Sequence, residues 1–147
     1  LVISGTGWSD AHRLARRALS AGVSGCIRFS GPLSNDDELA LLYSGAALYV
    51  QPSLAEGFGL PPLEAMACGS PVLSSTAGAL PETLGDAAVF LPPDDADAWA
   101  QTVSQLLAST ARLEDLSRRG ISRAREFTWE RTAGITMDAY RDALRGG

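Results

Sequence analysis

The sequence contains no lysine, a single histidine and only two cysteines. Without lysine, any contact with a phosphate group must come from arginine, a backbone N–H group or a hydroxyl group. His12 has no second histidine to act with, and Cys26 and Cys68 are far apart, so no zinc-ligand spacing is present. We therefore expect no metal ion. Both cysteines lie in apolar stretches, which favours buried free thiols in a protein of the reducing cytoplasm.

Long hydrophobic runs are also absent. No stretch reaches the roughly 18–20 apolar residues that span a membrane, and residues 1–5 lack the basic region and the length of a signal peptide. The net charge of −5 argues against a nucleic-acid partner, which would require a basic patch. The sequence does not begin with methionine, and its first residues have the pattern of a core strand. We therefore expect a fragment of a longer cytoplasmic protein, with any attachment to the inner face of the membrane made by that parent protein.

The 147 residues are 46% hydrophobic and 20% charged, which is ordinary for one globular domain with a sizeable core. Short apolar runs alternate with amphipathic ones, and this alternation predicts an α/β fold with a parallel sheet and helices on both faces. The expected strands are 1–4, 26–30, 46–51, 71–75 and 87–91. The expected helices are 9–21, 36–44, 62–68, 80–84, 94–108, 112–127 and 130–144. Residues 94–147 would form a helical tail of the same domain, with its arginines on solvated helix faces.

The segment from Glu56 to Glu64 carries the clearest signal of chemistry. It reads Glu-Gly-Phe-Gly-Leu-Pro-Pro-Leu-Glu, so two carboxylates enclose a glycine-rich turn and the start of an apolar helix. Gly57 and Gly59 let a ligand approach the backbone closely, and a helix N-terminus favours a phosphate group. The loop also follows a strand, at the sheet edge where ligands of parallel sheets bind. These features predict a site for a ligand with phosphate and hydroxyl groups, such as a nucleotide-sugar.

Three side chains of this segment have alternative interpretations. If Pro62 is the first helical residue, Glu64 is the third, where a glutamate stabilises the helix start instead of binding a ribose. Glu56 has no capping role, and it is either a ligand contact or a solvated loop residue. Phe58 either plugs the loop into the core, which the pattern favours, or forms a wall that faces a sugar.

Residues 52–72 resemble the E-x7-E signature of the family 4 retaining glycosyltransferases. Further stretches that resemble landmarks of this family are residues 1–5, 29–31, 37–39, 80–82 and 127–131. The resemblance therefore extends over nearly the whole chain. It implies the Rossmann-like C-terminal domain of a GT-B enzyme, which binds the nucleotide-sugar donor while a separate N-terminal domain binds the acceptor.

The resemblance also assigns roles to residues. Glu64 would bind the ribose hydroxyls, and Glu56, as the catalytic glutamate, would contact hydroxyls of the transferred sugar. The backbone that would meet the sugar and the diphosphate is that of Gly57, Phe58, Gly59 and Leu60. The backbone that would flank the base is that of Gly31, Pro32 and Leu33. The reaction would retain the anomeric configuration by a front-face transfer, without a metal or other cofactor, because N–H groups, the helix dipole and basic side chains stabilise the leaving diphosphate.

The implied partner is a GDP- or UDP-hexose, with mannose from GDP favoured over glucose-type UDP donors, for glycan or polysaccharide synthesis. In the family, an arginine and a lysine that hold the diphosphate precede the stretch present here, and the acceptor domain is missing. We therefore expect the isolated chain to transfer no sugar at a useful rate, and an exposed sheet edge to promote self-association. Two alternatives are a non-catalytic nucleotide-binding fragment or scaffold, and a sugar-nucleotide epimerase of the same architecture.

Overall fold

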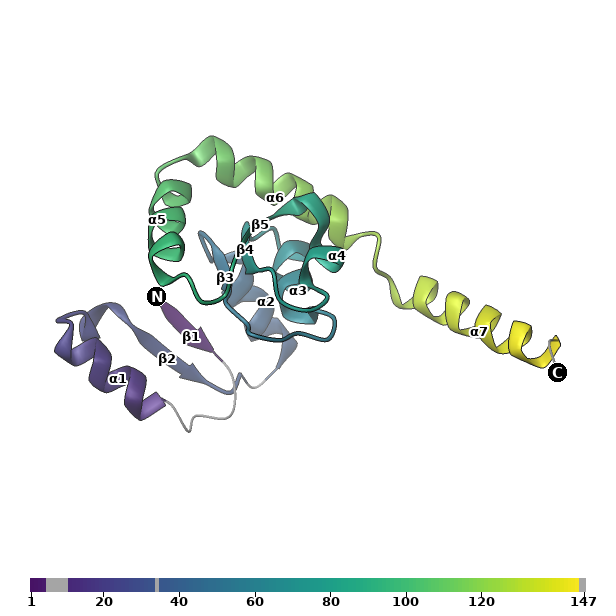
Figure 1. The fold of residues 1–147 in the computed structure, drawn as a ribbon, viewed down its shortest axis with the longest axis horizontal. Helices are drawn as coiled ribbons and strands as arrows, with labels where there is room; N and C mark the ends of the chain where they lie inside the picture. The colour runs from purple at the N-terminus through teal and green to yellow at the C-terminus, as the bar shows by residue number, and fades with distance from the viewer. Residues whose placement is uncertain (5–10, 34, 146–147) are drawn as a thin grey trace. The chain divides into compact units, whose positions relative to one another are not determined.

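The computed structural model describes residues 1–4, 11–33 and 35–145 (Figure 1). The chain forms two compact units, Leu1–Leu41 and Leu42–Gly147, and each is described by itself. The expectation of a single domain with a tail from residue 94 stays a prediction.

The first unit contains a pair of parallel strands. Its elements are β1 (Val2–Ser4), α1 (Ala11–Ser20), the 3-10 turn η2 (Ser24–Cys26), β2 (Arg28–Gly31) and the first part of α2 (Asp36–Ser44). Ile3 of β1 pairs with Phe29 of β2. The start of α2 follows from its sequence, because the Asn35 side-chain oxygen accepts a hydrogen bond from the N–H of Glu38 at 2.9 Å, as a helix-capping residue does.

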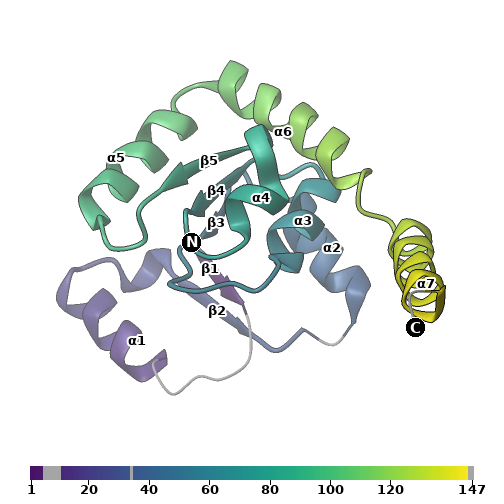
Figure 2. The ribbon, with the colours of Figure 1, turned by 45° about the vertical axis from the view of Figure 1, so that its right-hand side comes forward.

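The second unit contains a three-stranded parallel sheet in the order β3-β4-β5 (Figure 2). Its elements are β3 (Tyr49–Gln51), α3 (Leu60–Ala67), β4 (Val72–Ser75), α4 (Leu80–Leu84), the 3-10 turn η3 (Gly85–Ala87), β5 (Ala88–Leu91), α5 (Ala96–Leu107), α6 (Thr110–Ala124) and α7 (Trp129–Arg145). Tyr49 pairs with Val72, which pairs with Ala88, so the three strands are in register at their first residues. The predicted α/β class, with parallel strands and helices on both faces, is confirmed.

The core of the second unit forms around the central strand. All four residues of β4 are buried, as expected for a strand with a neighbour on each side and helices on both faces. Leu73 of β4 packs with Trp99 and Leu106 of α5 and with Leu116 of α6. The Trp99 indole N–H also donates to the carbonyl of Pro92 at 2.8 Å, which satisfies its one polar atom. This core holds the carboxyl ends of β3 and β4 in place, next to the loops that follow them.

The cysteines depart partly from expectation. Both are free thiols, as predicted, but neither is buried: Cys26 is exposed and Cys68 is half-buried. Cys26 lies in the turn η2 instead of the expected strand, and Cys68 follows the last residue of α3. Apolar neighbours in the sequence therefore do not imply that the cysteines are buried in the structure.

Among the described residues, no helix is both long and apolar enough to span a membrane.

Candidate functional site

The Glu56–Glu64 segment connects the carboxyl end of β3 to the start of α3. The helix begins at Leu60, two residues earlier than predicted, with Gly59 as the preceding cap residue. Gly59 has φ 96°, and a Cβ atom there would lie 2.9 Å from Cδ2 of Leu80. The prolines that follow lie in the first turn, where a backbone N–H would have no acceptor within the helix. Gly59 and the two prolines therefore place the start of α3 at Leu60, directly after the glycine turn.

A second loop clamps the backbone of this segment. The N–H of Ala79, just before α4, donates to the carbonyl oxygen of Glu56 at 3.2 Å. Gly78 has φ 57°, and a Cβ atom at this position would lie only 2.1 Å from the same oxygen. Only glycine permits so close an approach. The loop after β4 thus fixes the position of Glu56.

The helix-capping interpretation of Glu64 is wrong. Because α3 begins at Leu60, Glu64 is its fifth residue, and the first turn contains no acidic side chain. Glu64 is exposed, and its Oε2 accepts a hydrogen bond from the hydroxyl of Tyr43 at 3.2 Å. The glutamate is therefore an exposed acceptor group held by a side chain of α2.

Glu56 is half-buried and not a freely solvated loop residue. Its Oε2 accepts a hydrogen bond from Nε2 of Gln51 at 3.4 Å, and the same nitrogen donates to Oγ of Ser53 at 2.7 Å. Gln51 accepts in turn from the hydroxyl of Tyr49 at 2.5 Å. The carboxylate is thus attached to the end of β3 through side chains of that strand.

Two tyrosines are connected to the glutamates, Tyr43 directly to Glu64 and Tyr49 through Gln51 to Glu56, and the sequence pattern does not indicate this role. The rings of Tyr43 and Tyr49 meet edge to face, with centroids 5.6 Å apart. Burial, followed by the charges of Glu64 and Glu56, raises the pKa of Tyr49 well above its usual value near 10. Burial, then Tyr49 and Glu64, raises the pKa of Tyr43 in the same direction. Both hydroxyl groups therefore remain hydrogen-bond donors at neutral pH. The available signal was the i, i+2 spacing of Tyr49 and Gln51, which places both side chains on one face of a strand.

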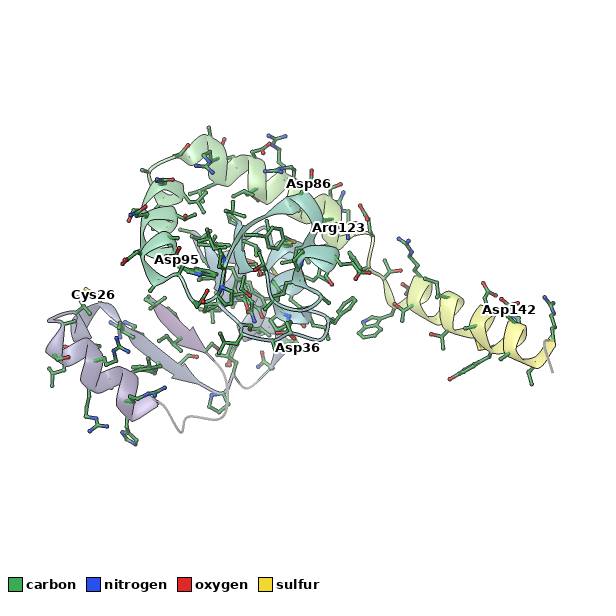
Figure 3. All side chains as sticks on the ribbon, viewed as in Figure 1. Cys26, Asp36, Asp86, Asp95, Arg123 and Asp142 are labelled. Atoms are coloured by element: carbon green, nitrogen blue, oxygen red, sulfur yellow. The ribbon has the colours of Figure 1, made fainter. Side chains whose placement is uncertain are left out.

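Phe58 does not plug the loop into the core, contrary to the favoured interpretation. Its side chain is 45% exposed. It contacts the ring of Phe127 edge to face, with centroids 5.8 Å apart. The guanidinium carbon of Arg123, a residue of α6 labelled in Figure 3, lies 4.8 Å from the centroid of the Phe127 ring. The tip of the glycine loop is therefore held by a residue just after α6.

The expected base-flanking residues belong to the first unit. Gly31 ends β2, with Pro32 and Leu33 after it, and the motif geometry above lies within residues 42–147. Of the expected site residues, Glu56 and Phe58 lie in the loop between β3 and α3, and Glu64 lies in α3. In the described part of the chain, no three histidine, cysteine, aspartate or glutamate side chains form a group that could hold a metal ion.

The chain resembles the members of a known protein family. The model of the family described as "Glycosyl transferases group 1" matches residues 1–125, which is most of the chain. The chain belongs to this family.

The relatives of this member of the group 1 family differ in the activities that their names describe. The chain is 40% identical over 144 residues to "O-antigen chain mannosyltransferase B" of Escherichia coli, covering 96% of this chain and 37% of that protein. It superposes on sucrose-phosphate synthase from Thermosynechococcus elongatus with TM-score 0.89 and 30% identity, covering all of this chain and 39% of that one. Anabaena HepE, solved with UDP and glucose, has the same fold, with TM-score 0.82 and 19% identity over 97% of this chain and 40% of that one. The chain therefore spans well under half the length of these proteins.

Proposed function

We propose that this chain is the donor-binding domain of a retaining family 4 glycosyltransferase that transfers a hexose from a nucleoside diphosphate. The observation that carries the proposal is the placement of two carboxylates around one helix start. Glu56 is attached to β3 and Glu64 to α2, and the glycine turn and the first turn of α3 lie between them. A nucleotide-sugar has hydroxyl groups at both ends and phosphates in the middle, and this order of groups complements the site.

The diphosphate is assigned to the turn before the prolines. A helix start carries partial positive charge, but Pro61 and Pro62 remove two of the N–H groups that an anion would otherwise use. The remaining donors are the N–H groups of the turn itself, and they fit the leaving diphosphate. These are the groups of Gly57, Phe58, Gly59 and Leu60. With no lysine in the sequence, such groups and arginine are the means of phosphate contact within this chain.

The two glutamates divide the hydroxyl contacts. Glu64, on the second turn of α3, binds the ribose hydroxyls, and Glu56 binds hydroxyls of the transferred sugar and is the catalytic glutamate. Retention of configuration follows from front-face transfer assisted by the leaving phosphate, and no metal is required. The backbone of Gly31, Pro32 and Leu33 flanks the base. The identity to a mannosyltransferase supports mannose as the transferred sugar. The favoured donor is therefore GDP-mannose, with a UDP-linked glucose as the alternative.

Calorimetric titration of the 147-residue chain with UDP, GDP and ADP tests the ribose assignment. We expect one nucleotide to bind, and Glu64→Gln to weaken this binding roughly tenfold or more, because hydrogen bonds to a charged group contribute roughly 1.5–3 kcal/mol. The matched control is Glu114→Gln, which removes a charge from an exposed face of α6 and should leave affinity unchanged. The proposal fails if no nucleotide binds or if Glu64→Gln and Glu114→Gln behave alike.

A second titration with the matching nucleotide-sugar tests the sugar assignment. Glu56→Gln should abolish the affinity that the sugar adds while leaving the affinity for the nucleotide itself nearly unchanged. Equal losses for the two ligands would contradict a specific sugar contact. We also expect the isolated chain to bind the donor without transferring the sugar.

A further inference from the structure

The bond between Tyr43 and Glu64 joins a buried donor to an exposed acceptor. Tyr43 is 8% exposed, whereas Glu64 lies on the surface of α3. A surface glutamate ordinarily samples many side-chain rotamers, and binding a ligand would require these to be restricted. The hydroxyl of Tyr43, 3.2 Å from Oε2, restricts them before any ligand arrives.

Tyr43 is itself held at both ends. Its ring packs edge to face on Tyr49, and its backbone carbonyl accepts a hydrogen bond from Oγ of Ser70. Ser70 is fully buried, and its N–H donates to the carbonyl of Ala65 at 2.9 Å, in the turn that ends α3. The end of α2 is therefore attached to the same helix that carries Glu64. This attachment sets the position of the hydroxyl relative to the carboxylate.

A hydroxyl that holds one carboxylate oxygen also sets the direction of the other. A carboxylate offers several acceptor positions on its two oxygens, so occupation of Oε2 by Tyr43 leaves Oε1 available to accept from further donors. Neighbouring hydroxyl groups on a ribose are donors of this kind. The contact with Glu64 accounts for a buried residue whose hydroxyl is directed at the surface of α3.

We propose that Tyr43 is a positioning residue that orients the carboxylate of Glu64 toward the ribose, and so makes the site select ribonucleotides over 2′-deoxyribonucleotides. This inference rests on the proposed function, because it requires Glu64 to meet the ribose. Tyr43 acts through Glu64 and contacts no part of the ligand itself. Its removal should therefore reduce the selectivity for ribose and not merely the affinity for nucleotides.

The test compares the affinity of the 147-residue chain for UDP, GDP and ADP with its affinity for their 2′-deoxy forms. In Tyr43→Phe, we expect the nucleotide that binds wild type best to bind about five- to tenfold more weakly, with the deoxy form changed by less than about twofold. Tyr43→Phe keeps the ring, so a melting curve should show a folded chain. Incorporation of 4-aminophenylalanine at position 43 restores an N–H donor and should restore the selectivity.

The matched control is Tyr49→Phe. It removes a hydroxyl from the same ring pair, but this hydroxyl donates to Gln51 and not to Glu64. We expect Tyr49→Phe to keep the wild-type ratio of ribonucleotide to deoxynucleotide affinity. If the two variants change the ratio equally, the effect comes from general loosening of the ring pair and the inference is overturned.

The remaining outcomes separate this inference from the proposed function. If Glu64→Gln abolishes the selectivity for ribose while folded Tyr43→Phe retains it, the ribose assignment stands and the role of Tyr43 is refuted. If wild type shows no selectivity, or Glu64→Gln does not alter it, both proposals fail. Loss of selectivity in Tyr43→Phe and its return with 4-aminophenylalanine would support both.

Discussion

Gly78 shows at the scale of a single residue how closely the motif loop is enclosed. Because Gly78 has no side chain, the carbonyl oxygen of Glu56 can approach its backbone closely. A Cβ atom at Gly78 would lie only 2.1 Å from this oxygen. Gly78 is outside the Glu56–Glu64 segment, so the motif by itself does not indicate the contact. Glu56 depends for its backbone position on a residue more than twenty positions along the chain.

Gly78→Ala is expected to destabilise the chain by several kcal/mol, since the new methyl group must displace backbone and not a flexible side-chain end. Urea denaturation of the purified chain measures this loss. Gly22→Ala is the matched control, because Gly22 also has a positive φ, 71°, but nothing lies within 4 Å of its Cβ position. We expect a loss of about 1–2 kcal/mol there from backbone strain alone. Equal losses at both positions would show that the clash with Glu56 is relieved at little cost.

Arg123 connects three elements, although the sequence pattern suggests a solvated helix face for it. Its Nε donates to the carbonyl of Thr83 at 2.9 Å, and its Nη2 donates to the carbonyl of Glu82 at 2.8 Å. These carbonyls lie in the last turn of α4, where helical acceptors lack partners within the helix. The guanidinium also lies over the ring of Phe127, which contacts Phe58 of the motif loop. One side chain of α6 therefore caps α4 and supports the loop.

Arg123→Gln should reduce the free energy of unfolding by about 2–3 kcal/mol, because two carbonyls lose charge-assisted hydrogen bonds, of which the one to Thr83 is part-buried. Chemical denaturation provides the measurement. Arg118→Gln on the same helix is the control: the Arg118 side chain is 75% exposed, against 26% for Arg123, and it pairs with Asp115 one turn away. A surface pair of this kind contributes at most about 1 kcal/mol. If both variants lose the same stability, α4 does not depend on Arg123.

The pair formed by buried Tyr43 and half-buried Tyr49 makes the stability of the molecule depend on pH in the alkaline range. Burial together with neighbouring negative charge raises the pKa values of Tyr43 and Tyr49 in the folded chain. Between the ordinary tyrosine pKa near 10 and these raised values, the folded state binds more protons than the unfolded state. The two tyrosines therefore make their full contribution to the free energy of unfolding below about pH 10, and this contribution falls as the pH rises above that value.

Denaturation series above about pH 9 test this dependence. With two protons involved, the slope should reach about 2.7 kcal/mol per pH unit at most. The double variant Tyr43→Phe/Tyr49→Phe should have a clearly shallower slope over the same range, while its stability at neutral pH reports the loss of the hydrogen bonds. An unchanged slope in the double variant would assign the alkaline loss to other groups.

Much of the architecture could be predicted from local patterns, and much of the site could not. The alternation of strands and helices is repeated along the chain, and proline and glycine mark several of its boundaries, so the α/β class and most elements were predictable. The start of α3 was misplaced because the position of the left-handed Gly59 had to be known before Leu60 could be recognised as the first helical residue. The role of Phe58 was misread because its partner, Phe127, is far away in the sequence.

The sequence by itself determined the parallel-strand fold class, the glycosyltransferase-like segment from Glu56 to Glu64 and the dependence of any phosphate contact on groups other than lysine. These properties arise from residue types and short spacings, which act locally. The tertiary structure decided that Glu64 is no helix cap, that Tyr43 and Gln51 hold the two glutamates, and that Gly78 and Arg123 enclose the loop. These contacts join residues from different elements, and only the packing of the end of α2, β3, α3, α4 and α6 brings them within hydrogen-bonding distance.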